Sequence, residues 1–137
     1  MTVGYEILEH TADIGIRSWG RSLEECFEQA AWGLAEILGA RGEERRGKLF
    51  HVFAGGEDRG AQLVDLLNEI LLLHETHEVA FVGIRVVEVS GSEVEAQLEV
   101  VPLRGETETT GVKAATFHRL DVRDVPEGVE ARVYLDV

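Results

Sequence analysis

Apolar side chains recur at two different spacings along this chain, and the two spacings predict its elements. Residues 23–38 carry them three and four positions apart, behind a capping box formed by Ser22 and Glu25. A second stretch, from about 59 to about 75, is apolar almost all round. Its polar exceptions form one narrow stripe: Asp65, Asn68 and Glu69. Because such a helix is buried on most sides, it is either the central helix of the core or a helix whose spare face meets a partner.

The rest of the chain is predicted to be β-strand. Short β-branched runs at 5–8 and 14–16 flank a polar tetrapeptide near the start. Further strands are predicted at 49–53, 81–89, 93–101, 116–122 and 130–137. The pair 81–89 and 93–101 should form a hairpin with one wet, acidic face. The pattern predicts an α+β fold: a two-layer sandwich in which two helices pack on a mixed or mostly antiparallel sheet. Strand order is not predicted.

Length and composition predict one domain spanning residues 1–137. The 137 residues are 45% hydrophobic, which is enough for a real core. No apolar run approaches the ~20 residues of a membrane span, so we expect no membrane association. Cys26 is the one cysteine and lies on the apolar face of the first helix, so it should be buried and inert. A reducing, cytoplasmic location is the expected setting.

The charge balance argues against one class of function. A net charge of −13 repels phosphate backbones, so we expect no tight direct binding of RNA. An acidic surface attracts cations or basic proteins, or it serves solubility alone. The one dense basic run in the sequence is partly cancelled by neighbouring glutamates and is predicted to be a solvated loop. It comprises Arg41, Arg45, Arg46 and Lys48.

Nucleophile and phosphate-loop motifs are missing from the sequence, and carboxylates remain as the candidate chemistry. His74 and His77 are three apart and lack zinc spacing, so they are predicted to mark the end of the second helix. Asp13 starts the second strand on the face opposite Ile14 and Ile16. Gly15 shares that face, and its missing side chain should leave space there for a cation or a basic group. The alternative is that Asp13 only stabilises a turn.

A second carboxylate pair stands at positions 136 and 137. Asp136 should face away from the core, and Val137 carries a main-chain carboxylate. Hard oxygen ligands of this kind suit Ca²⁺ or Mg²⁺; the alternative is a frayed terminus. Lys113 lies in a small-residue segment just before a strand, so backbone pairing should fix its position. By itself it has the character of a surface lysine.

Three motifs together resemble the archease family. They are His10-Thr11-Ala12-Asp13-Ile14-Gly15, Gly111-Val112-Lys113-Ala114 followed by Thr116-Phe117-His118, and Tyr134-Leu135-Asp136-Val137. The helix around residues 63–69 is similar to the middle segment of that family. The resemblance covers essentially the whole chain in order.

The resemblance implies a protein cofactor that is not itself an enzyme. Archease-like proteins activate the RNA-splicing ligase, which joins a 3′-phosphate or 2′,3′-cyclic phosphate end to a 5′-hydroxyl in tRNA splicing. They promote guanylylation of the ligase, which uses GTP and manganese, and its multiple turnover. By matching, Asp13, Asp136 and Val137 would hold a divalent cation (Ca²⁺, Mg²⁺ or Mn²⁺), and Lys113 would be needed for activity.

Two other functions stay open on the sequence alone. One is a chaperone-like interaction module that uses the apolar helix surface. The other is a metal-dependent hydrolase that uses the same carboxylates, although the sequence offers no general base with a distinct environment.

Overall fold

The computed structural model describes residues 3–9, 13–104 and 111–137. His10, Thr11 and Ala12 of the first motif lie outside these residues. Within the described part, the elements in chain order are β1 (Gly4–Glu9), β2 (Ile14–Gly20), α1 (Leu23–Ile37), β3 (Lys48–Gly55), α2 (Arg59–His77), β4 (Val79–Val89), β5 (Glu93–Pro102), β6 (Ala114–Val125) and β7 (Gly128–Asp136). Each predicted helix and strand is present, and most differ from the prediction only at their ends.

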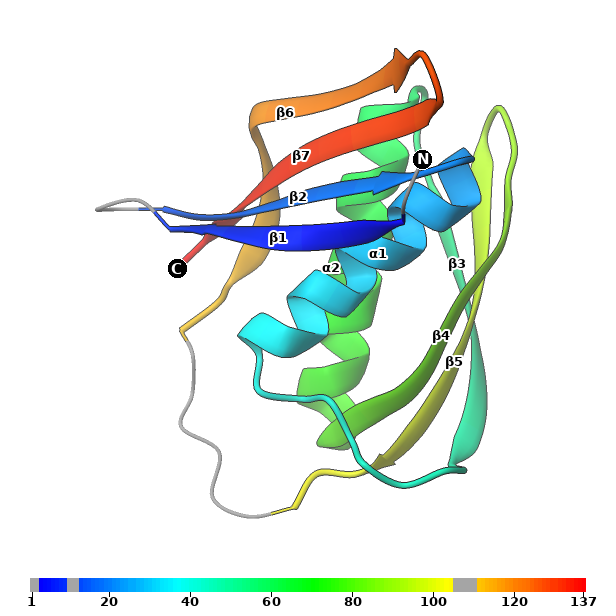
Figure 1. Ribbon diagram of the computed structural model, residues 1–137. Helices are drawn as coiled ribbons and strands as arrows, with labels where there is room; N and C mark the ends of the chain where they lie inside the picture. The colour runs from blue at the N-terminus through cyan, green and yellow to red at the C-terminus, as the bar shows by residue number, and fades with distance from the viewer. Residues whose placement is uncertain (1–2, 10–12, 105–110) are drawn as a thin grey trace.

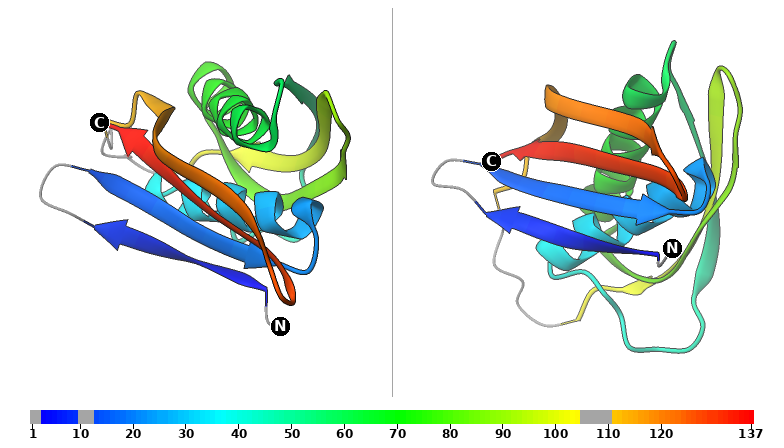
Figure 2. Two further views of the ribbon diagram at one scale, coloured as in Figure 1. Left: turned by 90° about the horizontal axis from the view of Figure 1, so that it is seen from above. Right: turned by 45° about the horizontal axis from the view of Figure 1, so that its top comes forward.

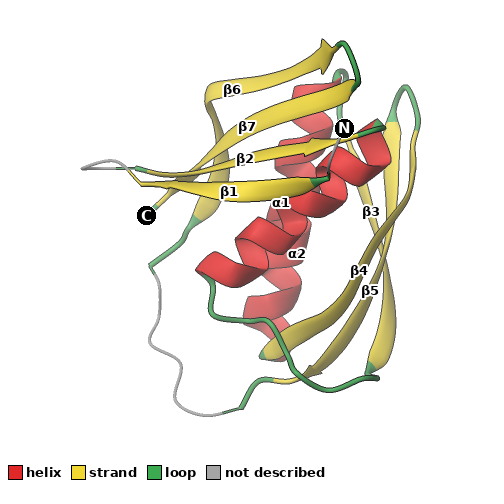
Figure 3. Ribbon diagram, in the orientation of Figure 1, coloured by secondary structure: helices red, strands yellow, loops and turns green. Residues whose placement is uncertain are grey.

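The strands divide into two antiparallel sheets. The first has the order β1-β2-β7-β6, and the second has the order β3-β5-β4. Both helices lie between the two sheets (Figures 1 and 2). With the elements coloured by type, Figure 3 shows the two helices held between yellow strands on either side.

The helix ends form as the sequence predicts. The amide of Glu25 donates to Ser22 Oγ at 3.2 Å, which closes the N-terminus of α1. Beyond its C-terminus, Gly39 has φ +64°, and the amide of Ala40 donates to the carbonyl of Ala35 at 2.9 Å. A residue with a side chain would be strained at that φ, so glycine belongs there.

The second helix is the centre of the core, as predicted. Its apolar residues, such as Leu66, Leu67 and Ile70, are fully buried, and Leu72 is its one large apolar side chain that is more than half exposed. The polar stripe bonds to backbone: Asp65 Oδ2 accepts from the amide of Gly55 at 2.8 Å. The helix continues to His77, slightly beyond the predicted end.

The α+β class and the antiparallel pairing are confirmed, with one difference in layering. We expected the helices to cover a single sheet, whereas the strands form two sheets with the helices between them. The reason is the near-uniform apolar surface of α2. A single sheet would cover only part of that surface, and the second sheet buries the remainder.

Cys26 is fully buried, as predicted. Burial raises the pKa of its thiol to about 11, against a smaller lowering by the hydrogen bond with Ser18. The thiolate is therefore scarce at neutral pH, and the side chain serves packing. Among the described residues, no helix has the length and hydropathy needed to cross a membrane.

Candidate functional site

The predicted site residues stand at the ends of three neighbouring strands of the four-stranded sheet: Asp13 precedes β2, Lys113 precedes β6, and Asp136 ends β7. Strand β2 pairs with β7 so that Ile14 faces Leu135, and β6 pairs with β7 so that Ala114 faces Asp136. Continuing the first register by one residue sets Asp13 opposite Asp136. Directly opposed residues in an antiparallel pair have Cβ atoms about 5 Å apart. On that register we expect the two carboxylates, from distant parts of the chain, to lie near each other.

Lys113 lies on the other side of Asp136. Its amide donates to the carbonyl of Asp136 at 2.7 Å, so the main chain at Lys113 is fixed, as predicted. The preceding residue, Val112, is buried in the core, while the lysine side chain is exposed. The geometry thus presents an ammonium group to solvent from a rigid backbone, beside the two carboxylates.

A helix side chain holds this segment in place. Asn68 Oδ1 accepts from the amide of Ala115 at 2.8 Å, and Asn68 Nδ2 donates to the carbonyl of the same residue at 3.3 Å. These two hydrogen bonds between a side-chain amide and the main-chain N–H and C=O of one residue tie the start of β6 to α2. It explains the polar stripe on an otherwise apolar helix, because Asn68 positions the residues that follow Lys113.

We expect Asn68→Ala to destabilise the protein by about 1–3 kcal/mol, because it leaves the main-chain N–H and C=O of the buried Ala115 without their side-chain partner. Thermal or denaturant unfolding measures this loss. Glu75→Ala, an exposed change on the same helix, is the matched control and should alter stability by less than about 0.5 kcal/mol. Equal stability of the two variants would contradict the role given to Asn68.

One expectation about the site was wrong. We expected Gly15 to leave open space beside Asp13, but the ring of Tyr134 occupies that space. A Cβ atom at position 15 would lie 2.7 Å from Tyr134 Cε1. The glycine is therefore needed for the close approach of the aromatic ring, and the tyrosine closes one side of the site.

The predicted ligands of the cation are all oxygen atoms, which suits a hard cation such as Ca²⁺ or Mg²⁺. Asp13 and Asp136 supply two side-chain carboxylates, and Val137, whose side chain is 45% exposed, follows directly on β7. Among the described residues, no group of three or more His, Cys, Asp or Glu side chains is placed to hold a metal ion. A cation here would need the main-chain carboxylate of Val137, a carbonyl or water as further ligands.

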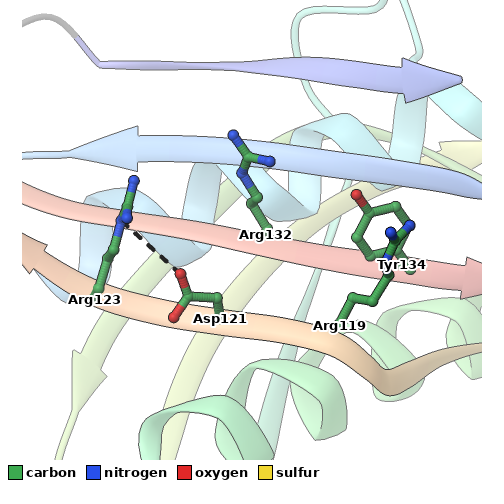
Figure 4. Close-up of a pocket in the computed structure, with 5 residues that line it drawn as sticks. All are labelled: Arg119, Asp121, Arg123, Arg132 and Tyr134. Atoms are coloured by element: carbon green, nitrogen blue, oxygen red, sulfur yellow. Dashed lines mark ion pairs between the residues drawn. The ribbon is translucent and has the colours of Figure 1, made fainter.

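A feature beside the site was not predicted from the sequence. An open groove of about 710 Å³ runs along β6 and β7 and is lined by Arg119, Asp121, Arg123, Arg132 and Tyr134 (Figure 4). It begins next to the carboxylates, because Tyr134 precedes Asp136 by two residues on the same face of β7.

The groove owes its shape to a bulge in β6. Thr116 pairs with Tyr134, but the next paired residue of β6 is Asp121, opposite Arg132. Residues 117–120 thus lie opposite the single residue Val133, and Arg119 takes a left-handed φ of +57°. A bulge redirects side chains at a strand edge, and a left-handed non-glycine residue is strained. In this strained conformation the side chain of Arg119 lies over the ring of Tyr134. The distance from its guanidinium carbon to the ring centroid is 5.7 Å.

Glu130 organises the other arginines of this sheet face. Arg17 Nε and Arg123 Nη2 each donate a hydrogen bond to its carboxylate at 3.2 Å. Arg132 Nε lies 3.9 Å from the same carboxylate, close enough for an ion pair. Burial alone would raise the pKa of Glu130, but Arg17 and Arg123 outweigh it and the pKa is lowered. Glu130 is therefore charged at neutral pH, and one carboxylate serves three guanidinium groups.

Comparison with known proteins agrees with the fold and the motifs. The model of the Archease protein family matches residues 5–137. Protein archease of Methanosarcina acetivorans is 33% identical over 97% of this chain and 95% of its own length. Protein archease of Thermococcus gammatolerans is 35% identical over 90% of this chain and 91% of its own.

Two solved structures share the architecture. The solution structure of Methanobacterium thermoautotrophicum protein 1598 has a TM-score of 0.78 and 29% identity, covering 98% of this chain and 99% of that one. The crystal structure of a Thermotoga maritima archease, described as a possible chaperone, has a TM-score of 0.60, 22% identity and 96% coverage of both chains. At that identity the second structure supports the fold alone.

These observations define an α+β protein in which two sheets enclose two helices. With the family model matching nearly the whole chain and close relatives named archease, this chain belongs to the archease family.

Proposed function

We propose that this chain is a protein cofactor that activates an RNA-splicing ligase by promoting its guanylylation and turnover. Membership of the archease family supports the proposal, since the family's motifs are matched in order. The observation that supports it is the strand register. The amide of Lys113 donates to the carbonyl of Asp136, and the pairing of β2 with β7, continued by one residue, would bring Asp13 opposite Asp136. These are the three residues that the resemblance assigns to activation.

In this proposal the residues divide the work between them. Asp13, Asp136 and the main-chain carboxylate of Val137 hold a divalent cation. When bound, the cation supplies a positive centre at the sheet end and neutralises carboxylates that would otherwise repel one another. Lys113 presents a point charge on a flexible stem, which suits contact with a phosphate in the nucleotide pocket of the partner.

The direct test is a guanylylation assay with a purified RNA-splicing ligase. Labelled GTP reports covalent guanylylate on the ligase, and ligated RNA per ligase molecule reports turnover. We expect this chain to raise both, and we expect the chain alone to produce no ligation or hydrolysis of the RNA ends. Unchanged guanylylation and single turnover with the chain present would contradict the proposal. RNA-end hydrolysis by the chain alone would instead favour the metal-dependent hydrolase.

One observation favours a second candidate, a chaperone-like interaction module. Leu49 and Phe53 on the edge strand β3 and Leu72 on α2 are each more than half exposed. Contiguous patches of exposed apolar side chains mark protein contacts, and Leu49 and Phe53 lie on the same exposed face of β3. This candidate predicts that the chain suppresses aggregation of unrelated unfolding proteins in a light-scattering assay. Suppression that Leu49→Ser and Phe53→Ser both abolish would support it.

A further inference from the structure

We propose that the groove between β6 and β7 binds one phosphomonoester group, with Arg119 and Arg132 as its ligands. The ligand chemistry is a terminal phosphate, carried either by a mononucleotide or by an RNA end. The site lies beside the cluster discussed above and deepens the proposed function, but it is a property of this chain alone and can be measured without a ligase.

The charge of the groove selects the ligand. Three arginines and one aspartate line it, an excess of two positive charges in a chain whose net charge is −13. A phosphomonoester carries about −1.5 to −2 charges at neutral pH, which matches this excess better than a single carboxylate does. Guanidinium forks also fit the oxygen geometry of phosphate.

Arg119 is the arginine that the structure leaves available. Among the described residues it forms no ion pair with a carboxylate, and its guanidinium rests on the ring of Tyr134. The left-handed backbone of the bulge directs it there, while the following residue, Leu120, packs on the core against the backbone of Gly60. The anchored leucine fixes the bulge, so the exposed arginine is positioned before any ligand arrives.

Arg132 extends the same surface. It is about half exposed and stands 3.9 Å from the carboxylate of Glu130, a distance beyond a hydrogen bond. Glu130 is already held by Arg17 and Arg123, so the donors of Arg132 stay largely unused. Arg119 comes from β6 and Arg132 from β7, and both line the groove. In Figure 4 the guanidinium of Arg119 lies at the ring of Tyr134, and Arg132 stands apart from both, further along β7.

The remaining surface limits the size of the ligand. An extended nucleic-acid strand would have to cross carboxylates outside the groove, including Asp136 and Glu6. Repulsion from these groups and from the acidic chain opposes a run of phosphates but not one terminal phosphate in the groove. The inference is therefore compatible with the absence of tight RNA binding expected from the net charge.

The test is a titration of the isotope-labelled chain at low salt, followed by NMR. The probes are GMP, an RNA trinucleotide with a 3′-phosphate, and the same trinucleotide with a 3′-hydroxyl. We expect one or both phosphomonoesters to shift the signals of Arg119 and Arg132, and the 3′-hydroxyl trinucleotide to bind much more weakly. The comparison of GMP with the 3′-phosphate identifies the source of the phosphate.

Substitutions make the assignment specific. Arg119→Gln and Arg132→Gln should each weaken binding about tenfold, because each removes a charge-assisted bond. Arg119→Asn should weaken binding as much as Arg119→Gln does. Because asparagine tolerates a left-handed backbone, this variant controls for a change in the conformation of the bulge. Arg85→Gln, the same change of charge on the exposed face of the other sheet, is the matched control and should leave binding unchanged.

Three results would overturn the inference. They are the absence of shifts at millimolar phosphomonoester, binding that survives both groove substitutions, and tighter binding of an acidic peptide than of either phosphomonoester at the same residues. The proposed ligase activation would fail separately, in the guanylylation assay, so the two failures are distinguishable.

Discussion

Lys113→Ala abolishes stimulation of ligase guanylylation while the protein melts within a few degrees of wild type; this is the result we expect. The side chain is exposed, and an exposed substitution changes stability by at most about 0.5 kcal/mol. The hydrogen bond that fixes the segment comes from the main-chain amide of Lys113 and survives the change. The fold and the two carboxylates should therefore be intact, and only the ammonium group should be lost.

The chain offers an exact charge control for this experiment. Lys48 is the only other lysine, and it lies on β3 in the second sheet. Lys48→Ala removes the same charge and should leave stimulation unchanged. Lys113→Arg separates charge from shape, because a planar guanidinium is larger than an ammonium group and should restore little activity in a tight pocket. Stimulation by Lys113→Ala equal to that of wild type would contradict the role assigned to Lys113.

Local sequence patterns were sufficient for the elements but not for their layers. The capping box at Ser22 and the helical spacing behind it depend on neighbours a few residues away, so they could be predicted. The division into two sheets depends on which strands pair, and pairing joins residues such as Ile14 and Leu135 that are far apart in sequence. Apolar alternation states that a strand has a buried face but not which strand lies beside it.

The same distinction applies to the site. Motifs selected Asp13, Asp136 and Lys113, and of these the structure joins Lys113 to Asp136 by a main-chain hydrogen bond. The role of Asn68 could have been suspected from an amide on an apolar helix, although its partner Ala115 could not. Gly15 was misinterpreted, because a missing side chain signals either a cavity or the close approach of another group, and here Tyr134 approaches.

The basic residues show most clearly what sequence patterns cannot predict. The dense run that includes Arg41 was the only basic cluster visible in the sequence. Yet Arg41 does not simply face solvent, since it donates to the hydroxyl of Tyr5 at 2.7 Å and lies over the ring of Trp32. The cluster on the four-stranded sheet is assembled from Arg17, Arg119, Arg123 and Arg132, on three different strands. No local charge pattern could have revealed it.

The second large effect concerns the paired carboxylates. We expect Ca²⁺ or Mg²⁺ to raise the melting temperature of the wild-type chain, because a ligand that binds only the folded state stabilises it, by about 2.7 kcal/mol at a concentration 100 times its Kd. Asp13→Asn and Asp136→Asn should each abolish that rise. Without a cation the same variants should be as stable as wild type or slightly more stable, because each relieves repulsion between adjoining carboxylates.

This opposite behaviour with and without the cation distinguishes a binding site from a structural role. A carboxylate that only capped a turn would lose stability on substitution in both conditions. Asp121→Asn, an exposed change on β6 of the same sheet, is the control and should keep the full cation-dependent rise.

A short extension after Val137, which moves the main-chain carboxylate away, should reduce the rise in melting temperature if that group is the third ligand. A melting temperature that no cation changes, or a rise that Asp13→Asn and Asp136→Asn retain, would show that these residues do not hold a metal. Stimulation of the ligase would then have to act through Lys113 without a cation bound beside it.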